Sequence, residues 1–221
     1  MLAAGVASSL AQSNVYSLNV VGYANVPYTN GFQMIANQLH SDSTGTNNTI
    51  QGVFGTNGWP NLTKVYGFNP ASGFGIATFG AGSGTWVGGQ PTVNTALSAG
   101  GGVWLQIPGA SGTSGNVTEV GEVHQGTTSL PVVAGFQIMS LVPPISTPIK
   151  TGLVTPGYPA GNLDKVYTFV NPSGFTIHTY ASGSGTWTGG EPTPKVGEAF
   201  WVQRTAANGA TTWVQTYNVP Q

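Results

Sequence analysis

Residues 64–74, KVYGFNPASGF, return almost unchanged as residues 165–175, KVYTFVNPSGF. A second stretch, GSGTW at residues 82–86, returns at residues 183–187. The step of 101 residues is too long for one unit of a solenoid and fits a whole small domain, so it indicates a tandem duplication. We therefore expect residues kept in both copies to serve the fold, and residues present in one copy to be special or incidental.

The segments between Gly and Pro clusters are short and rich in Val, Ile, Thr, Tyr, Phe and Trp, which is typical of strands. They predict strands at 15–25, 32–38, 64–68, 73–79, 85–87, 102–107 and 116–123, and again at 127–133, 136–141, 165–170, 175–180, 186–188, 199–204 and 211–219. Alternation within 175–180 puts Phe175 and Ile177 on the face opposite His178. Helical periodicity is almost absent, so we predict an all-β fold of two tandem, homologous β-sandwich or small-barrel domains.

The expected boundaries are residues 12–116 for copy one and 117–221 for copy two. Residues 117–123 close copy one, yet they match the opening pattern at 19–23, and NVP at 25–27 is echoed at 218–220. A strand of this type thus lies at the start, middle and end of the chain, and a free terminal strand can pair with another molecule. The residues for such strand exchange are Val15, Tyr16, Leu18, Val20 and Val21. The alternative is that the first and last strands pair within one molecule and close it.

Charge is the unusual feature of the composition. Only 5% of the residues are charged, with five basic and six acidic side chains and a net charge of −1. No basic patch is available for phosphates or anionic lipid, which argues against nucleic acid as a partner. A near-neutral polar surface permits packing against itself or another neutral surface; the alternative is the uncharged coat of a secreted protein.

Residues 1–11, MLAAGVASSLA, are apolar and small and end in a small-x-small pattern, which predicts the remnant of an export signal, with mature protein from Gln12. The alternative is an ordinary apolar N-terminal segment. No later apolar run approaches the ~20 residues that span a bilayer. There is no cysteine, which excludes disulfides and thiolate chemistry. We expect an extracellular or cell-surface location.

Several motifs resemble those of an uncharacterised family of exported bacterial proteins of the verrucomicrobial type, which carry two repeats after a signal peptide. The matching stretches are VVGYANV at 20–26, GFQMIANQL at 31–39, KVYGF at 64–68, Trp86 and GEAFWV at 197–202. The resemblance covers nearly the whole mature chain. It implies export and a duplicated β fold, and it transfers no catalytic residue.

Candidates for catalysis are few. Glu191 and Glu198 are the best pair for glycoside hydrolysis, which needs two facing carboxylates, but copy one has Gln90 and Gly101 in their places. The alternative is two solvated turn residues. The three histidines lack ligand spacing, and no Gly-x-Ser-x-Gly elbow precedes a helix. We therefore expect no catalytic residue, no metal and no cofactor.

Duplicated aromatic residues are the sharper signal. Trp86 and Trp187 follow Gly-Ser-Gly-Thr in both copies, and Gln106 and Gln203 each follow a strand Trp by two residues. An exposed Trp beside an amide can stack on a sugar while the amide bonds its hydroxyls. The alternative is that these Trp residues are core or cover the end of a sheet.

Three functional hypotheses follow. The first is a non-enzymatic structural protein of the cell surface or extracellular matrix, which self-assembles into filaments by terminal strand exchange. The second is a carbohydrate-binding module or adhesin that uses Trp86, Trp187, Gln106 and Gln203. The third is a hydrolase-like enzyme with its site in copy two only. The expected partner is the protein itself, or a polysaccharide.

Overall fold

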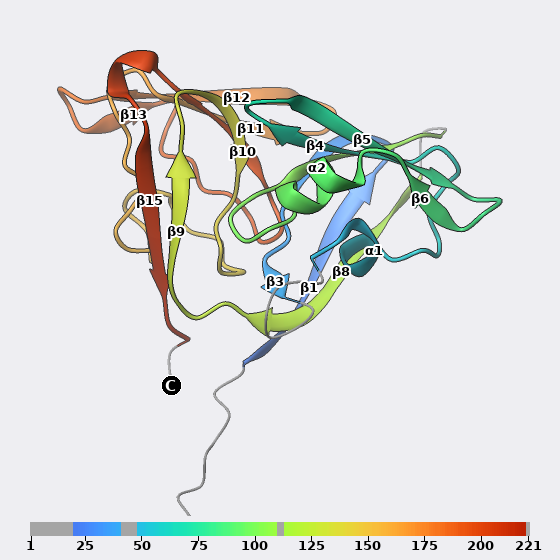
Figure 1. Ribbon diagram of the computed structural model, residues 1–221. Coiled ribbons are helices and arrows are strands. Elements are labelled where there is room, and N and C mark those ends of the chain that lie inside the picture. Colours follow the sequence, from blue (N-terminus) through green and yellow to red (C-terminus); the bar gives the residue numbers. More distant parts are fainter. Residues whose placement is uncertain (1–19, 41–47, 110–112, 220–221) are drawn as a thin grey trace, which may run out of the picture.

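The computed structural model describes residues 20–40, 48–109 and 113–219, and it shows antiparallel β-sheets with little helix (Figure 1). The all-β prediction is therefore confirmed, and the later predicted strands are present with small shifts at their ends. The strand predicted at 15–25 is described as Val21–Thr29, and residues 15–19 lie outside the described range. The first half holds β1 (Val21–Thr29), β2 (Gly31–Ile35), β3 (Leu39–His40), α1 (Ile50–Phe54), β4 (Lys64–Asn69), β5 (Gly73–Gly80), β6 (Thr85–Val87), α2 (Gln90–Ala96), β7 (Val103–Ile107) and β8 (Ser114–Val123). The second half holds β9 (Gly126–Val132), β10 (Gly135–Met139), β11 (Lys165–Val170), β12 (Gly174–Ala181), β13 (Thr186–Thr188), β14 (Phe200–Arg204), a 3₁₀ turn (Ala206–Asn208) and β15 (Thr211–Tyr217).

Each half contains a five-stranded sheet and a long two-stranded ribbon. The sheets have the orders β2-β7-β4-β5-β6 and β10-β14-β11-β12-β13. These orders are the same when the strands are counted within each half and the short β3, which has no counterpart in the second half, is left out. The ribbons are β1 with β8, to which β3 adds a short edge, and β9 with β15. The boundary predicted between residues 116 and 117 falls inside β8 and is wrong, because β8 pairs with β1 along its length. The seam between the halves lies at residues 124–125.

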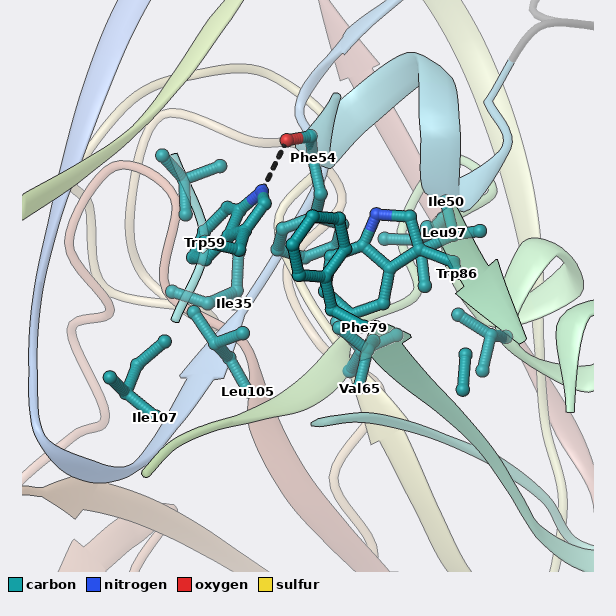
Figure 2. Packing of buried hydrophobic residues seen from close by; sticks show 14 of the residues in the cluster. Ile35, Ile50, Phe54, Trp59, Val65, Phe79, Trp86, Leu97, Leu105 and Ile107 are labelled. Carbon is teal, nitrogen blue, oxygen red and sulfur yellow. Dashed lines mark hydrogen bonds between the residues drawn. The ribbon is translucent and has the colours of Figure 1, made fainter. Parts of the chain in front are cut away.

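Each ribbon packs on the inner face of its sheet and encloses an apolar core. In the first half, the side chains of Val26 and Val117 from the ribbon meet Val65 and Leu105 from the sheet. Figure 2 shows how Trp59, Trp86 and other large side chains fill this core. The second core is built likewise, with Trp213 of the ribbon and Phe200 of the sheet fully buried. This layered packing gives a β-sandwich-like architecture.

The two halves also share a third core, which joins their sheets. Met34, Ala36, Ile138 and Ala199 are buried there. Around them, the ring centroids of Phe68 and Trp201 lie 4.9 Å apart, and those of Trp104 and Phe169 lie 4.8 Å apart. These two pairs occupy equivalent positions in the repeat. The halves therefore meet through one surface used twice, as in a two-fold symmetric dimer.

Helix α2 was not predicted, and its presence in only one half has a local cause. A side chain at Gly67 would approach the α2 backbone at Val93 to 2.6 Å, and one at Gly75 would meet Thr92 at 2.6 Å. Without these side chains, the helix can lie directly on β4 and β5. The second half has Thr168 and Thr176 at the two equivalent places, and no helix is assigned to residues 189–199.

The opening strand docks into its own molecule. Val21 pairs with Glu122 at one end of the β1–β8 ribbon, and Thr29 pairs with Ser114 at the other. The carbonyl oxygen of Val20 accepts a hydrogen bond from Val123 N–H at 2.8 Å. The remaining strand-exchange candidates, Val15, Tyr16 and Leu18, lie outside the described residues, as does the predicted export signal at 1–11.

Candidate binding surface

The strand pattern sends a second set of large side chains to the outer face of each sheet. In β4, Val65 points into the core while Tyr66 points away from it. In β5, Ala77 and Phe79 are buried while Phe74 and Ile76 are exposed. The outer face thus carries aromatic and branched residues where a half-buried strand normally carries polar ones.

Strand register gathers these side chains into two groups. Tyr66 is paired with Trp104 on one side and with Ile76 on the other, and Phe32 and Phe74 complete the group. We call Phe32, Tyr66, Phe74, Ile76 and Trp104 the first aromatic face. The equivalent residues Phe136, Tyr167, Phe175, Ile177 and Trp201 form the second aromatic face.

The first aromatic face is hollowed into a groove of about 470 Å³, whose far wall comes from the other half. The ring centroids of Phe32 and Tyr66 are 6.1 Å apart, and those of Phe32 and Trp104 are 6.0 Å apart. Phe169 and Phe175 complete the lining, with the Phe175 ring 5.8 Å from that of Trp104. On the second aromatic face, Phe74 of the first half takes the equivalent place, with its ring centroid 6.1 Å from that of Trp201.

Much of this apolar surface meets solvent. Phe32, Phe74, Ile76, Phe136, Phe175 and Ile177 are each between 42% and 53% exposed. Single exposed apolar residues are common on proteins, whereas a contiguous exposed group is typical of interaction surfaces. The edge-to-face arrangement of the rings leaves several ring faces open to a ligand.

A polar row borders each aromatic face. The Tyr66 hydroxyl donates to Gln106 Oε1 at 2.5 Å, and the Tyr167 hydroxyl donates to Gln203 Oε1 at 2.6 Å. Partial burial raises the pKa of Tyr66, so its hydroxyl keeps its proton at neutral pH. Within the described chain, no group accepts a hydrogen bond from the Gln106 amide nitrogen, which leaves its two N–H groups for a ligand.

Of the residues predicted to bind glycan, only the two glutamines lie on this surface. Trp86 is 3% exposed and packs among Phe54, Trp59 and Phe79 (Figure 2). Its ring N–H donates to the Gly55 carbonyl at 2.8 Å. Trp187 is 8% exposed, within the second core. Neither ring offers a face to a sugar, so their assignment as stacking residues is wrong. Trp104 and Trp201, which are partly buried, lie on the aromatic faces instead.

The two predicted hydrolase residues do not face each other across a cleft. The Glu191 carboxylate accepts hydrogen bonds from the backbone N–H groups of Lys150 and Thr151, at 2.6 and 2.7 Å, and from the Thr151 hydroxyl. It therefore holds a loop. Glu198 lines a groove of about 540 Å³ between the halves, whose lining does not include Glu191. Burial raises the pKa of Glu198, although Lys195 opposes the shift.

His178 lines the same groove as Glu198, but both of its ring nitrogens are engaged within the protein. Nδ1 lies 2.8 Å from the Gly190 carbonyl oxygen, and Nε2 lies 3.2 Å from the Thr168 hydroxyl. This imidazole is hydrogen-bonded to the protein through both nitrogens. Among residues 20–40, 48–109 and 113–219, no three His, Cys, Asp or Glu side chains gather as a metal site.

Two buried acids escaped prediction. Asp164 forms a buried ion pair with Arg204 at 2.9 Å and also accepts hydrogen bonds from Gly161 N–H and Thr205 N–H. Glu119 is 4% exposed, and one of its oxygens has no partner. The first half has Thr63 and Ile107 where the second has Asp164 and Arg204, so the repeat alone did not indicate this pair.

Comparison of the chain with protein-family models, curated proteins and solved structures found no match. No helix in the described ranges has the length and hydropathy of a transmembrane segment.

Proposed function

We propose that the protein is an exported, non-enzymatic component of the cell surface or extracellular matrix, and that it binds polysaccharide through its two aromatic faces. The observation that supports this function is the repetition of an exposed aromatic cluster with a hydrogen-bonded Tyr–Gln pair at its border. Glu191, Asp164 and His178 are each bonded within the fold, which favours binding over catalysis.

The chemistry of the faces suits a sugar polymer. The C–H face of a pyranose ring is apolar and stacks on an exposed aromatic ring, while its hydroxyls need donors and acceptors at the rim. Phe32 and Trp104 supply rings, and the Gln106 amide supplies N–H donors at the border of the same groove. Two equivalent faces on one chain allow one polymer to be held at two points, which multiplies weak contacts into avidity.

Affinity gel electrophoresis in soluble polysaccharides tests this function. We expect at least one polymer to retard the wild-type protein. We expect Phe74→Ser with Phe175→Ser to weaken that binding about thirtyfold, because the double variant loses two exposed rings worth about 1 kcal/mol each. Val120→Ser is the matched control, since Val120 is equally exposed on ribbon strand β8. Equal retardation of the double variant and the wild type would refute the proposal.

Self-assembly is the second candidate. It is favoured by the apolar surface of the same faces together with a charged fraction of 5% and a net charge of −1. The assembly route would be face to face, because the described part of the opening strand, Val20 and Val21, is already paired in its own chain. Sedimentation velocity over a hundredfold range of concentration tests this route, and a monomer throughout would exclude it.

A further inference from the structure

The cationic side chains are unevenly placed on this chain. Arg204 is buried against Asp164, and the Lys150 ammonium lies 5.1 Å from the centre of the Tyr180 ring. Lys64 and Lys165, by contrast, each stand on the strand that carries the central Tyr of an aromatic face. They are also the only charged residues present at equivalent positions in both halves.

Register puts each of these lysines in the polar row beside its aromatic face. Lys64 is paired with Gln106 on β7 and with Thr78 on β5, and it precedes Tyr66 by two residues, so the two side chains leave the same side of β4. Lys165 is placed identically by Gln203 and Thr179. A Lys, a Gln and a Thr thus border the rings of both halves.

Neither lysine is neutralised by a described residue. The ion pair that the described residues form joins Arg204 to Asp164, and neither Lys64 nor Lys165 contacts a carboxylate among them. Glu119 and Asp164 are buried, and Glu191 is bound to a loop. Glu122 lies on the ribbon strand β8, and Glu198 lies in the groove between the halves, where it accepts a hydrogen bond from Lys195 N–H. Each aromatic face therefore has one free positive charge and no described negative one.

We infer that the two aromatic faces select an acidic polysaccharide, with the Lys64 and Lys165 ammonium groups pairing with sugar carboxylates while the adjacent rings stack on the sugars. This inference rests on the proposed function and narrows its ligand to uronic-acid polymers. One lysine per face matches a polymer whose charges are spaced by whole sugar rings. A nucleic acid, with a charge every 1.7 Å along a duplex, calls for many cations, and this chain has five.

The repetition adds a length requirement. A single exposed ion pair contributes little in water, so one face alone holds a short uronide weakly. A polymer that reaches both faces gains effective concentration from the first contact. We therefore expect long chains of polygalacturonate to bind more tightly than the trimer, and both lysines to contribute to that difference.

The test compares polygalacturonate with its methyl-esterified form, which keeps the sugar rings and loses the carboxylate charge. We expect the wild-type protein to bind the acid form about tenfold more tightly at low salt. Lys64→Gln with Lys165→Gln should remove this preference, and Lys64→Arg with Lys165→Arg should keep it. Lys150→Gln with Lys195→Gln carries the same change in net charge away from the faces and should leave the preference intact.

The outcomes separate the inference from the function it rests on. Equal binding of the acid and esterified polymers by the wild type overturns the inference and leaves polysaccharide binding standing. If the protein binds neither of these polymers and no other polysaccharide, both the inference and the proposed function are refuted. Loss of the preference in the Lys150 and Lys195 control, or equally tight binding of duplex DNA, shows that lysines attract a polyanion wherever they lie on the protein, and also overturns the inference.

Discussion

Glu119 offers the sharpest test of the structure, because replacing it with Gln should alter stability in a way that depends on pH. Its side chain is 4% exposed on β8. One carboxyl oxygen accepts a hydrogen bond from Gln38 N–H at 3.2 Å, and the other has no partner. It lines a cavity of about 30 Å³ with Asn48, whose side-chain oxygen also lacks a partner. Because Glu119 Oε1 and Asn48 Oδ1 are both buried acceptors without a donor, a proton on the carboxyl group is favoured.

The magnitude follows from the pKa. Burial raises the pKa of Glu119 from its ordinary 4.5 to about 7, against the smaller effect of the Gln38 hydrogen bond. Below pH 4.5 the carboxyl is protonated in both the folded and the unfolded chain. As the pH rises to about 7, the unfolded chain releases its proton while the folded chain keeps it, so the free energy of unfolding falls. At about 1.36 kcal/mol per pKa unit, the total loss is about 3 kcal/mol.

Urea unfolding followed by Trp fluorescence, at intervals from pH 4 to pH 8, measures this loss. The Glu119→Gln variant carries no titrating group at this position. Its stability relative to the wild type should therefore rise by about 3 kcal/mol between pH 4.5 and pH 7.5, and stay level above that range. Glu122→Gln, on the same strand, controls for the loss of one carboxylate. A difference between Glu119→Gln and wild type that is constant across the pH range would refute the reasoning.

Four further substitutions test the packing. Asp164→Asn should lower the free energy of unfolding by about 3–5 kcal/mol in chemical denaturation, because Arg204 is left buried without its counter-charge. Trp86→Ala should lower the free energy of unfolding by about 3–5 kcal/mol in the same measurement, because its side chain is buried. Phe74→Ala, on the aromatic face, should lower it by no more than about 1 kcal/mol. Similar losses for the two variants would contradict the assignment of inner and outer faces. Asn171→Ala removes hydrogen bonds of 3.0 and 2.7 Å to Thr29 and Asn30 in the other half, so calorimetry should show a loss of about 1–2 kcal/mol; an unchanged melting temperature would exclude this contact.

The strands were predictable because their signal is local. Short runs of branched and aromatic residues between Gly and Pro clusters indicated every strand except the two-residue β3, and the duplication doubled the evidence. The α2 helix was not predictable from its own sequence, Gln90–Ala96, which contains Pro, Thr, Val and Asn and has low helix propensity. It forms because Gly67 and Gly75, distant in the chain, leave room for it on the sheet.

The candidate surface was harder to predict, because strands with large apolar residues on both faces do not reveal which face is buried. Alternation correctly separated Phe175 and Ile177 from His178, and the structure shows that the first two face solvent while His178 is buried. The same ambiguity misled the interpretation of Trp86, which lies on the inner face of β6 beneath α1 and its following loop. The register between β4 and β7 was needed to bring Gln106 beside Tyr66, and register depends on tertiary pairing.

The seam at residues 124–125 makes the order of the two halves exchangeable. Val20 is bonded to Val123 just before the seam, and Val219 N–H reaches the Gln125 side chain at 3.4 Å, so both outer ends of the described chain arrive at the point where the halves are joined. A circular permutant that begins at Gly126, continues through a short linker from residue 219 to residue 20, and ends at Val123 would preserve every strand pairing. If residues 219 and 20 were linked, the chain could be opened at the seam and the two halves would follow each other in the reverse order.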